Sequence, residues 1–329
     1  MTSNSRAVCS SVKTLVRSIP ALDPLRRAYH RGRTLVEHSK EPKYFERVLG
    51  SNFYEPSRYL FLHWWVSKNF GDAASLEIAR ALSGRTPLAI SQYPKAPWHP
   101  CFSAVGSVLQ FRAPSLDVWG SGFIEISARF YAKPKKVHAV RGPLTRRLVL
   151  DQGVDCPDVY GDPAVFMFDK FLDLARSGRY KVGILPHYYD AGHPGITRMA
   201  EDDRVLIIDV LKPVAEIAKA FAECEVIVSS SLHGLILADA MGIPSRWLGV
   251  SHMVQKGGFK FQDYFASVGR DEKEPLAITA LSVSKAIQQA HSRLVPFNRE
   301  RLLDVCPFRA ASISSLQQVS FSDEVLGKA

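Results

Sequence analysis

The sequence predicts an α/β protein in which two units each contain a parallel sheet covered by helices on both faces. Short apolar runs alternate with amphipathic helical segments from residue 58 onward, which is the pattern of strands buried on both sides. The same alternation starts again near residue 180, and 329 residues are enough for two units of ordinary size.

Strands are expected wherever an apolar run has strand length. In the first unit these runs are residues 59–66, 88–91, 104–109, 116–119 and 136–140. In the second unit they are residues 181–185, 205–210, 225–229 and 243–250.

Helices are expected between these strands. The first is predicted to have Asp72 as its cap and Gly84 at its end, and its buried face is formed by Leu76, Ala79 and Leu82. The next begins near Pro143 and ends at Gly153, with Leu144 and Leu148 on its apolar face. The helices of the second unit are expected at residues 214–221, 232–242 and 259–268.

Four parts of the chain follow from this pattern. Residues 169–179 are polar and are interpreted as a linker, and residues 276–329 are expected to be helical and then frayed. The predicted domains are a basic extension (1–50), a first lobe (51–175), a second lobe (176–270) and a C-terminal helical segment and tail (271–329).

The composition is that of a soluble globular protein, with 46% hydrophobic and 22% charged residues and no apolar run of about 18 residues. The five cysteines are scattered without a CxxC pair, which favours a reducing, cytoplasmic location over a disulfide framework or a zinc knuckle. Although the net charge is +10, the chain has none of the motifs typical of nucleic-acid binding.

The charge is concentrated near the N-terminus. Residues 1–36 contain seven Lys or Arg residues and one Asp, without the apolar core of a secretory signal. A solvated tail is the favoured interpretation. The alternative is peripheral contact with the inner, anionic face of the cytoplasmic membrane.

Ligands of doubly wound sheets bind where strands end and helices begin. After the first strand, Asn69, Gly71 and Asp72 lie in this position; Gly71 allows close backbone approach to a ligand. Asp72 is either a helix cap, which the local pattern favours, or a general acid or base.

Two further loops of the first unit carry candidate residues. Gly120, Ser121 and Gly122 follow a strand and fit either a backbone that contacts a ligand or a tight turn. Arg141 precedes a helix, where either bidentate capture of a phosphate or carboxylate or a surface ion pair is expected. Asp162 lies in a Gly-Asp-Pro turn and is either a turn former or functional.

The segment Ser229–Gly234 (SSSLHG) gives the strongest signal in the second unit. Hydroxyls at Ser230 and Ser231 and the imidazole of His233 at the end of a buried strand are costly unless they bind something. The alternative is a capping serine and a structurally bonded histidine. Gly234 completes the segment.

His187, Asp190 and His193 have a spacing compatible with a metal, but they lie in an irregular loop, so no metal is expected. His187 is expected to contact substrate. The chain has no GxxxxGK[ST] or GxGxxG motif, so the usual nucleotide and dinucleotide sites are not expected.

Together these segments resemble the polysaccharide pyruvyl transferase family over about residues 58–270. The motifs that carry the resemblance are NFGD (69–72), VWGSG (118–122), AVRGPLTR (139–146), VYGDPAV (159–165) and SSSLHGLILADAMGIP (229–244). The last motif, with FKFQDYFASVGR (259–270), is similar to the ketal pyruvate transferases of xanthan- and succinoglycan-type exopolysaccharides. Many family members have SRxHG, where this chain has Ser231 in place of the arginine.

The resemblance implies two Rossmann-like lobes in a glycosyltransferase-B-like architecture, with the active site in the cleft. It also implies phosphoenolpyruvate as donor, a lipid-linked oligosaccharide as acceptor, and a cyclic pyruvate ketal as product, without a cofactor or metal. Such chemistry requires cations for the donor and an acid or base. Arg141 is the first choice for the anion clamp and Lys260 the second, His233 is expected at the donor, and Asp72 is a candidate base.

Two other functions stay open at this stage. A nucleotide-sugar glycosyltransferase has the same expected fold, although no pair of glutamates is separated by seven intervening residues as in many retaining enzymes. The other is a saccharide-binding or scaffold protein without activity.

Overall fold

The computed structural model describes residues 57–65, 69–90, 100–111, 115–251, 256–291, 298–315 and 318–321. Residues 55–329 form one compact unit. The basic N-terminal extension lies outside the described residues, and its expected contact with a membrane stays a prediction. No helix among the described residues is long and apolar enough to cross a membrane.

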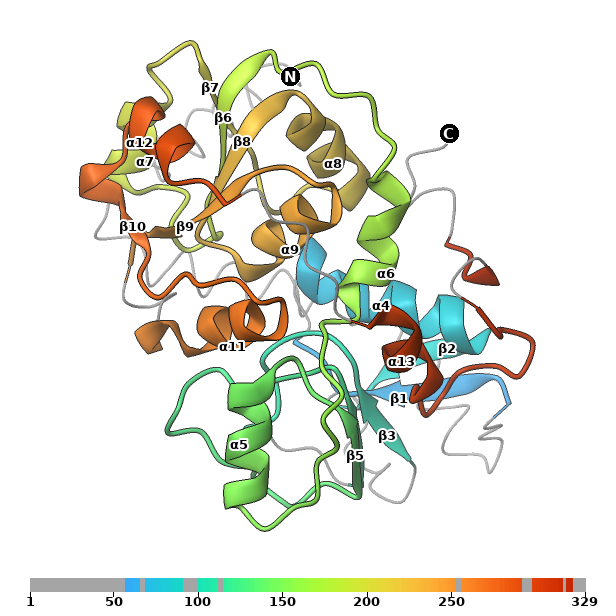
Figure 1. Ribbon diagram of the computed structural model, residues 1–329. Coiled ribbons are helices and arrows are strands. Elements are labelled where there is room, and N and C mark those ends of the chain that lie inside the picture. The colour runs from blue at the N-terminus through green and yellow to red at the C-terminus, as the bar shows by residue number, and fades with distance from the viewer. Residues whose placement is uncertain are drawn as a thin grey trace, which may run out of the picture. The chain divides into compact units, whose positions relative to one another are not determined.

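The protein is a mixed α/β structure with two parallel sheets of five strands each (Figure 1), which confirms the predicted class. The first sheet has the strand order β2-β1-β3-β4-β5. Its strands are β1 (Tyr59–Leu62), β2 (Thr86–Ala89), β3 (Cys101–Ser103), β4 (Leu116–Trp119) and β5 (Lys136–Ala139). The second sheet has the order β10-β9-β8-β6-β7. Its strands are β6 (Tyr180–Leu185), β7 (Val205–Ile207), β8 (Cys224–Ser229), β9 (Ser245–Gly249) and β10 (Leu276–Ala277).

Helices connect the successive strands of the second sheet, because parallel neighbours need a crossover. In the first sheet the helix Phe70–Ser83 lies between the first two strands, and no described helix separates the last three. The helices of the first half are α4 (Phe70–Ser83), α5 (Pro143–Asp151) and α6 (Ala164–Phe168), followed by a 3-10 turn, η3 (Asp169–Phe171). In the second half they are α7 (Pro194–Met199), α8 (Val214–Ala222), α9 (Leu232–Ala240), η4 (Lys256–Gly258), α11 (Phe259–Ser267), η5 (Ile278–Ala280), α12 (Val283–Gln288) and α13 (Arg299–Asp304).

One hydrophobic core continues from the first sheet to the second. It joins Leu60 of β1 and Phe70 of α4 through the wholly buried helix α6 to Leu235 of α9 and Phe221 of α8. A second cluster covers the other face of the second sheet, where Val182, Ile184 and Leu248 pack against residues of α7 and α12. The shared core holds the carboxyl ends of β1 and β8 near each other, since α4 and α9 follow these strands and contact each other.

Three local predictions are wrong, in addition to that for Leu76 of α4, which is half-buried and not buried with Ala79 and Leu82. Residues 104–109 are not a strand; β3 lies just before them, and Gly106 has a φ of 102° that ends the extended backbone. Their apolar character reflects burial in a loop, because Val105, Val108 and Leu109 are all buried. The cap of α4 is Asn69, whose side chain accepts a hydrogen bond from the N–H of Gly71, and Asp72 lies in the first turn.

The third error concerns α5. Leu144 is 36% exposed, whereas Thr145, Leu148 and Val149 form the buried face. The buried face of α5 is therefore rotated by one residue from the predicted face, because Thr145 and not Leu144 points into the core. The C-terminal part of the chain also contains a strand, β10, in addition to the expected helices.

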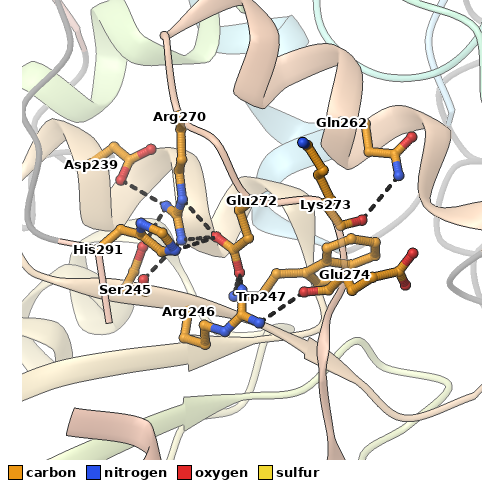
Figure 2. Close-up of polar contacts among 10 residues, drawn as sticks. All are labelled: Asp239, Ser245, Arg246, Trp247, Gln262, Arg270, Glu272, Lys273, Glu274 and His291. Carbon is orange, nitrogen blue, oxygen red and sulfur yellow. Dashed lines mark hydrogen bonds and ion pairs between the residues drawn. The ribbon is translucent and has the colours of Figure 1, made fainter. Parts of the chain in front are cut away.

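A charged network fixes the end of α11 to β9 (Figure 2). Glu272 bonds both Arg270, through Nε at 2.7 Å, and Arg246, and it also accepts the backbone N–H of Trp247 at 2.9 Å. Arg270 reaches the carbonyl of Ser245 at 2.8 Å and the carboxylate of Asp239 at 3.3 Å. Burial raises the pKa of Asp239 to about 6, although Arg270 and Tyr264 oppose this.

Candidate active site

The candidate site lies at the carboxyl ends of parallel strands, where the sequence placed it. The loops after β1, β4 and β5 supply residues from the first sheet, and those after β6 and β8 supply residues from the second. Several of these residues contact one another across the two sheets, as the following distances show.

His233 is the residue at which the two halves meet. It lies in the first turn of α9, 7% exposed, and its imidazole packs against the backbone of Gly71. A Cβ atom added at Gly71 would lie 2.0 Å from Nδ1 of His233, so only glycine fits there. The glycine of the NFGD segment therefore contacts the other half of the protein directly.

Asp162 faces the opposite edge of the same imidazole. Its Oδ2 lies 3.6 Å from Nε2 of His233, and both atoms are buried without a hydrogen-bond partner among the described residues. Its Oδ1 accepts the N–H of Ala164 at 3.0 Å, so Asp162 also forms the turn before α6. Asp162 can thus be both a turn former and a functional residue, because Oδ1 stabilises the turn and Oδ2 faces His233.

A carboxylate that the sequence analysis discounted, Asp190, organises the serines after β8. Ser230 donates to Oδ2 of Asp190 at 2.8 Å and accepts the N–H of His187 at 2.9 Å. Ser251 donates to Oδ1 of Asp190 at 2.5 Å. Burial raises the pKa of Asp190, and these serine hydroxyls oppose the increase.

The other members of the segment have structural contacts. Ser231 is buried and is the N-cap residue of α9, without a capping bond from its side chain. Gly234 allows α9 to approach β8, since a Cβ there would lie 2.4 Å from Oγ of Ser229.

Arg141 occupies a different environment from either expected one. Its guanidinium is fully buried and donates to Oδ2 of Asp263 at 3.0 Å, to Oγ of Ser107 at 2.6 Å and to the carbonyl of Phe123 at 2.7 Å. Asp263 also accepts the N–H and hydroxyl of Thr145. Arg141 is therefore neither a surface ion pair nor an open anion clamp but part of a buried link between α5 and α11.

The two glycines after β4, Gly120 and Gly122, lie at positions where a side chain would collide with Pro163 or Arg141. Gly120 has a φ of 89°, and a Cβ there would lie 2.2 Å from Cδ of Pro163. A Cβ at Gly122 would lie 2.6 Å from Cζ of Arg141. Between them Ser121 is fully buried, and its hydroxyl has no hydrogen-bond partner among the described residues.

The surroundings of His187 favour its neutral form. Burial, and then electrostatic interactions with Lys260 and His233, lower the pKa of His187 to about 3, so the ring is neutral at pH 7. The described residues contain no group of three His, Cys, Asp or Glu side chains that could hold a metal ion. His193 instead accepts the N–H of Gly195 through Nδ1 and caps α7.

The structure brings some of the predicted residues together and separates others. Residues of one connected group are Asn69, Gly71, Asp162, His187, Ser230 and His233. The charge of Lys260 acts on His187, and that of Asp72 acts on the neighbouring Tyr188. Three residues with roles here, Asp263, Thr145 and Ser251, were not predicted from the sequence, because a partner far along the chain leaves no local signal. No role was predicted for the aromatic residues Trp65, Phe111, Tyr188 and Tyr189.

Comparison with known proteins shows which family part of the chain is similar to. Residues 113–252 match the family model described as polysaccharide pyruvyl transferase. This span includes Arg141, Asp162, His187 and His233, and the spatially adjacent Gly71 lies outside it. The match confirms the resemblance inferred from the sequence over residues 113–252, which match a polysaccharide pyruvyl transferase domain and support an enzyme of that class.

Two relatives cover most of the chain. The succinoglycan biosynthesis protein ExoV of Rhizobium meliloti (strain 1021) is 29% identical over 236 residues, which are 68% of this chain and 70% of that protein. The uncharacterized protein L143 of Acanthamoeba polyphaga mimivirus is 29% identical over 217 residues, which are 64% of this chain and 75% of the viral protein. No solved structure is significantly similar to the chain.

Proposed function

We propose that this enzyme transfers the pyruvyl group of phosphoenolpyruvate to a hexose of an exopolysaccharide repeat unit, forming a cyclic ketal and releasing phosphate. The observation that carries the proposal is the buried pair of His233 and Asp162, whose facing atoms lack other partners among the described residues. Such a pair is suited to hold and deliver a proton, which this reaction requires. The proposed acceptor is lipid-linked, and the relative ExoV is named for the biosynthesis of a polysaccharide, succinoglycan.

The bond changes define what the residues must do. The methylene carbon of phosphoenolpyruvate accepts a proton, and one sugar hydroxyl bonds to the central carbon. The C–O bond to phosphate then breaks, and a second hydroxyl of the same sugar closes the ring. One hydroxyl proton balances the new methyl group and the other leaves with phosphate, so neither an oxidant nor a cofactor is required.

His233 is the proposed proton donor. Asp162 stabilises the imidazolium from the side of Nε2, while Nδ1 lies on the edge that packs against Gly71. The contact of Nε2 with Asp162 keeps the ring oriented for proton delivery. Asp72 is the proposed base for a sugar hydroxyl, because it lies in the first turn of α4 beside the same loop.

Lys260 and the N-terminus of α9 are proposed to bind the negatively charged groups of the donor, because backbone N–H groups at a helix N-terminus favour an anion. Arg141 is assigned a positioning role, because its buried bond to Asp263 joins the loop after β5 to α11, which carries Lys260. The two sheets with their carboxyl ends at one site support a glycosyltransferase-B-like arrangement with the substrates between the lobes.

A phosphate-release assay with phosphoenolpyruvate and galactosyl, glucosyl and mannosyl acceptors tests the proposal. His233→Gln should lower kcat by about 100-fold or more and Asp162→Asn by about 10-fold, since the proton would be lost or misdirected. His138→Gln is the control, because His138 forms a comparable pair with Asp117 at 3.0 Å on β5 and β4.

Equal rates for the parent and His233→Gln would refute the assignment of the proton donor. Release of a nucleotide from a sugar nucleotide, with phosphoenolpyruvate unused, would establish the glycosyltransferase alternative instead.

A further inference from the structure

Most of the exposed aromatic side chains gather beside the candidate active site. Four aromatic residues are among the large hydrophobic residues that the described part of the chain exposes: Trp65, Phe111, Tyr131 and Tyr189. Trp65 follows β1 and Phe111 follows β3, and their ring centroids are 5.5 Å apart. Tyr189 follows β6 and stacks against Tyr188 with centroids 4.4 Å apart.

The two pairs are joined through Tyr188. Burial raises the pKa of the Tyr188 hydroxyl, and hydrogen bonding to Tyr189 and the negative charge of Asp72 add to this. Hydrogen bonding to Trp65 acts on the same hydroxyl in the opposite direction. Four residues, Trp65, Phe111, Tyr188 and Tyr189, here called the aromatic platform, therefore combine loops from both sheets. The negative charge of Asp72 acts on one of them, Tyr188.

The platform is next to the proposed reacting groups. The ring of His187 lies 4.2 Å from that of Tyr188 and 5.4 Å from that of Tyr189, measured between centroids. Electrostatic interactions with Lys260 and His233 lower the pKa of His187, so these two residues lie near its ring. A ligand on the platform would thus have one end near the site of proton transfer.

Exposed aromatic rings are costly in water, and a group of them usually marks a surface that a ligand covers. Trp65 is 45% exposed, Phe111 41% and Tyr189 39%. A pyranose has an apolar face of C–H groups and a rim of hydroxyls. Solvent-facing aromatic rings suit the C–H face, and a nearby carboxylate and tyrosine hydroxyl suit the sugar hydroxyls.

We infer that the aromatic platform is the subsite for the acceptor hexose, with Trp65, Phe111 and Tyr189 stacking on the sugar and Asp72 directed to its hydroxyls. The inference rests on the proposed function for the identity of the reaction. The surface it assigns binds an uncharged pyranose whether or not phosphoenolpyruvate is the donor.

The test compares Trp65→Ala, Phe111→Ala and Tyr189→Ala with Tyr131→Ala, an exposed aromatic residue outside the platform. In the phosphate-release assay each platform variant should raise the KM for the acceptor by about 10-fold and leave that for phosphoenolpyruvate within about 2-fold. Tyr131→Ala should change neither. Trp65→Phe and Tyr189→Phe keep a ring and should recover most of the loss.

Binding without turnover separates this inference from the proposed function. Saturation-transfer NMR with a neutral galactosyl or glucosyl oligosaccharide should detect binding to the parent and not to Trp65→Ala, with circular dichroism confirming that the variant is folded. If phosphoenolpyruvate is not used but this binding depends on Trp65, the proposed function fails and the subsite stands.

If phosphoenolpyruvate is used and the platform variants keep the parental acceptor KM, the subsite is refuted and the proposed function stands. Binding of uridine diphosphate to the platform in place of the oligosaccharide would also refute the subsite.

Discussion

His233 and Asp162 each place one buried polar atom where no other described residue forms a hydrogen bond with it. Leaving a buried polar atom without a hydrogen bond typically costs about 1–3 kcal/mol, so two facing atoms of this kind are an expensive local feature. The distance of 3.6 Å is slightly too long for a hydrogen bond and short enough for a proton to strengthen the contact. This arrangement is understandable at a site where a proton is held and released.

The neutral state of His187 has a consequence for stability. Its pKa is about 3 in the folded protein, below the ordinary value of 6.5, because burial and electrostatic interactions with Lys260 and His233 disfavour the charged ring. The unfolded chain therefore binds more protons, and the contribution of His187 to stability is present above pH 6.5 and is lost as the pH falls toward 3.

We therefore expect the parent to lose thermal stability relative to His187→Asn when the pH is lowered from 7 to 5. The upper limit is about 1.4 kcal/mol per pH unit, and the partial exposure of the ring reduces it. Thermal midpoints of the two proteins at pH 7, 6 and 5 measure the effect. A constant difference between them across this range would show that His187 is not held neutral by its surroundings.

At the level of secondary-structure elements, the link between α5 and α11 depends on one buried ion pair. Asp263 accepts bonds from Arg141 and from both the backbone and the hydroxyl of Thr145. The two helices approach so closely that a Cβ at Gly142 would lie 2.0 Å from the carbonyl oxygen of Asp263. Removing one charge would leave the other buried and unpaired.

A double-mutant cycle tests this link. Arg141→Met and Asp263→Leu should each destabilise the protein by about 3–5 kcal/mol, and the double variant should lose less than the sum of the two. Arg147→Met is the control on the same helix, since Arg147 and Asp151 form an exposed pair worth less than about 0.5 kcal/mol. Chemical unfolding measures all four, and additive losses would show that the pair is not coupled.

The elements were predictable to the extent that their signals are local. The strand of residues 116–119 and the helix after Pro143 were placed correctly, because apolar runs and glycine or proline breaks lie within the element itself. Residues 104–109 were misplaced, since a buried loop and a buried strand have the same composition. The environment of Arg141 depends on a residue 122 positions away, and no spacing within the motif predicts it.

In the protein as a whole, one hydrophobic core spans both sheets, and the candidate site lies where strands of both end. His233 from the second half packs on Gly71 from the first, which explains why motifs on either side of residue 175 are needed for a single site. The predicted domain boundaries stay predictions, because the shared core does not separate at residue 175. The order of the five motifs along the chain was enough to predict that they converge, but not which side chains face each other.

The most direct test of the central claim is NMR analysis of the product formed from phosphoenolpyruvate and a hexose acceptor in D2O. Proton delivery to the methylene carbon predicts a ketal whose methyl group carries one deuterium (CH2D), formed in equal amount with phosphate and strongly reduced with His233→Gln. An acceptor that gains a hexose from a sugar nucleotide, and no ketal methyl group from phosphoenolpyruvate, would contradict the account.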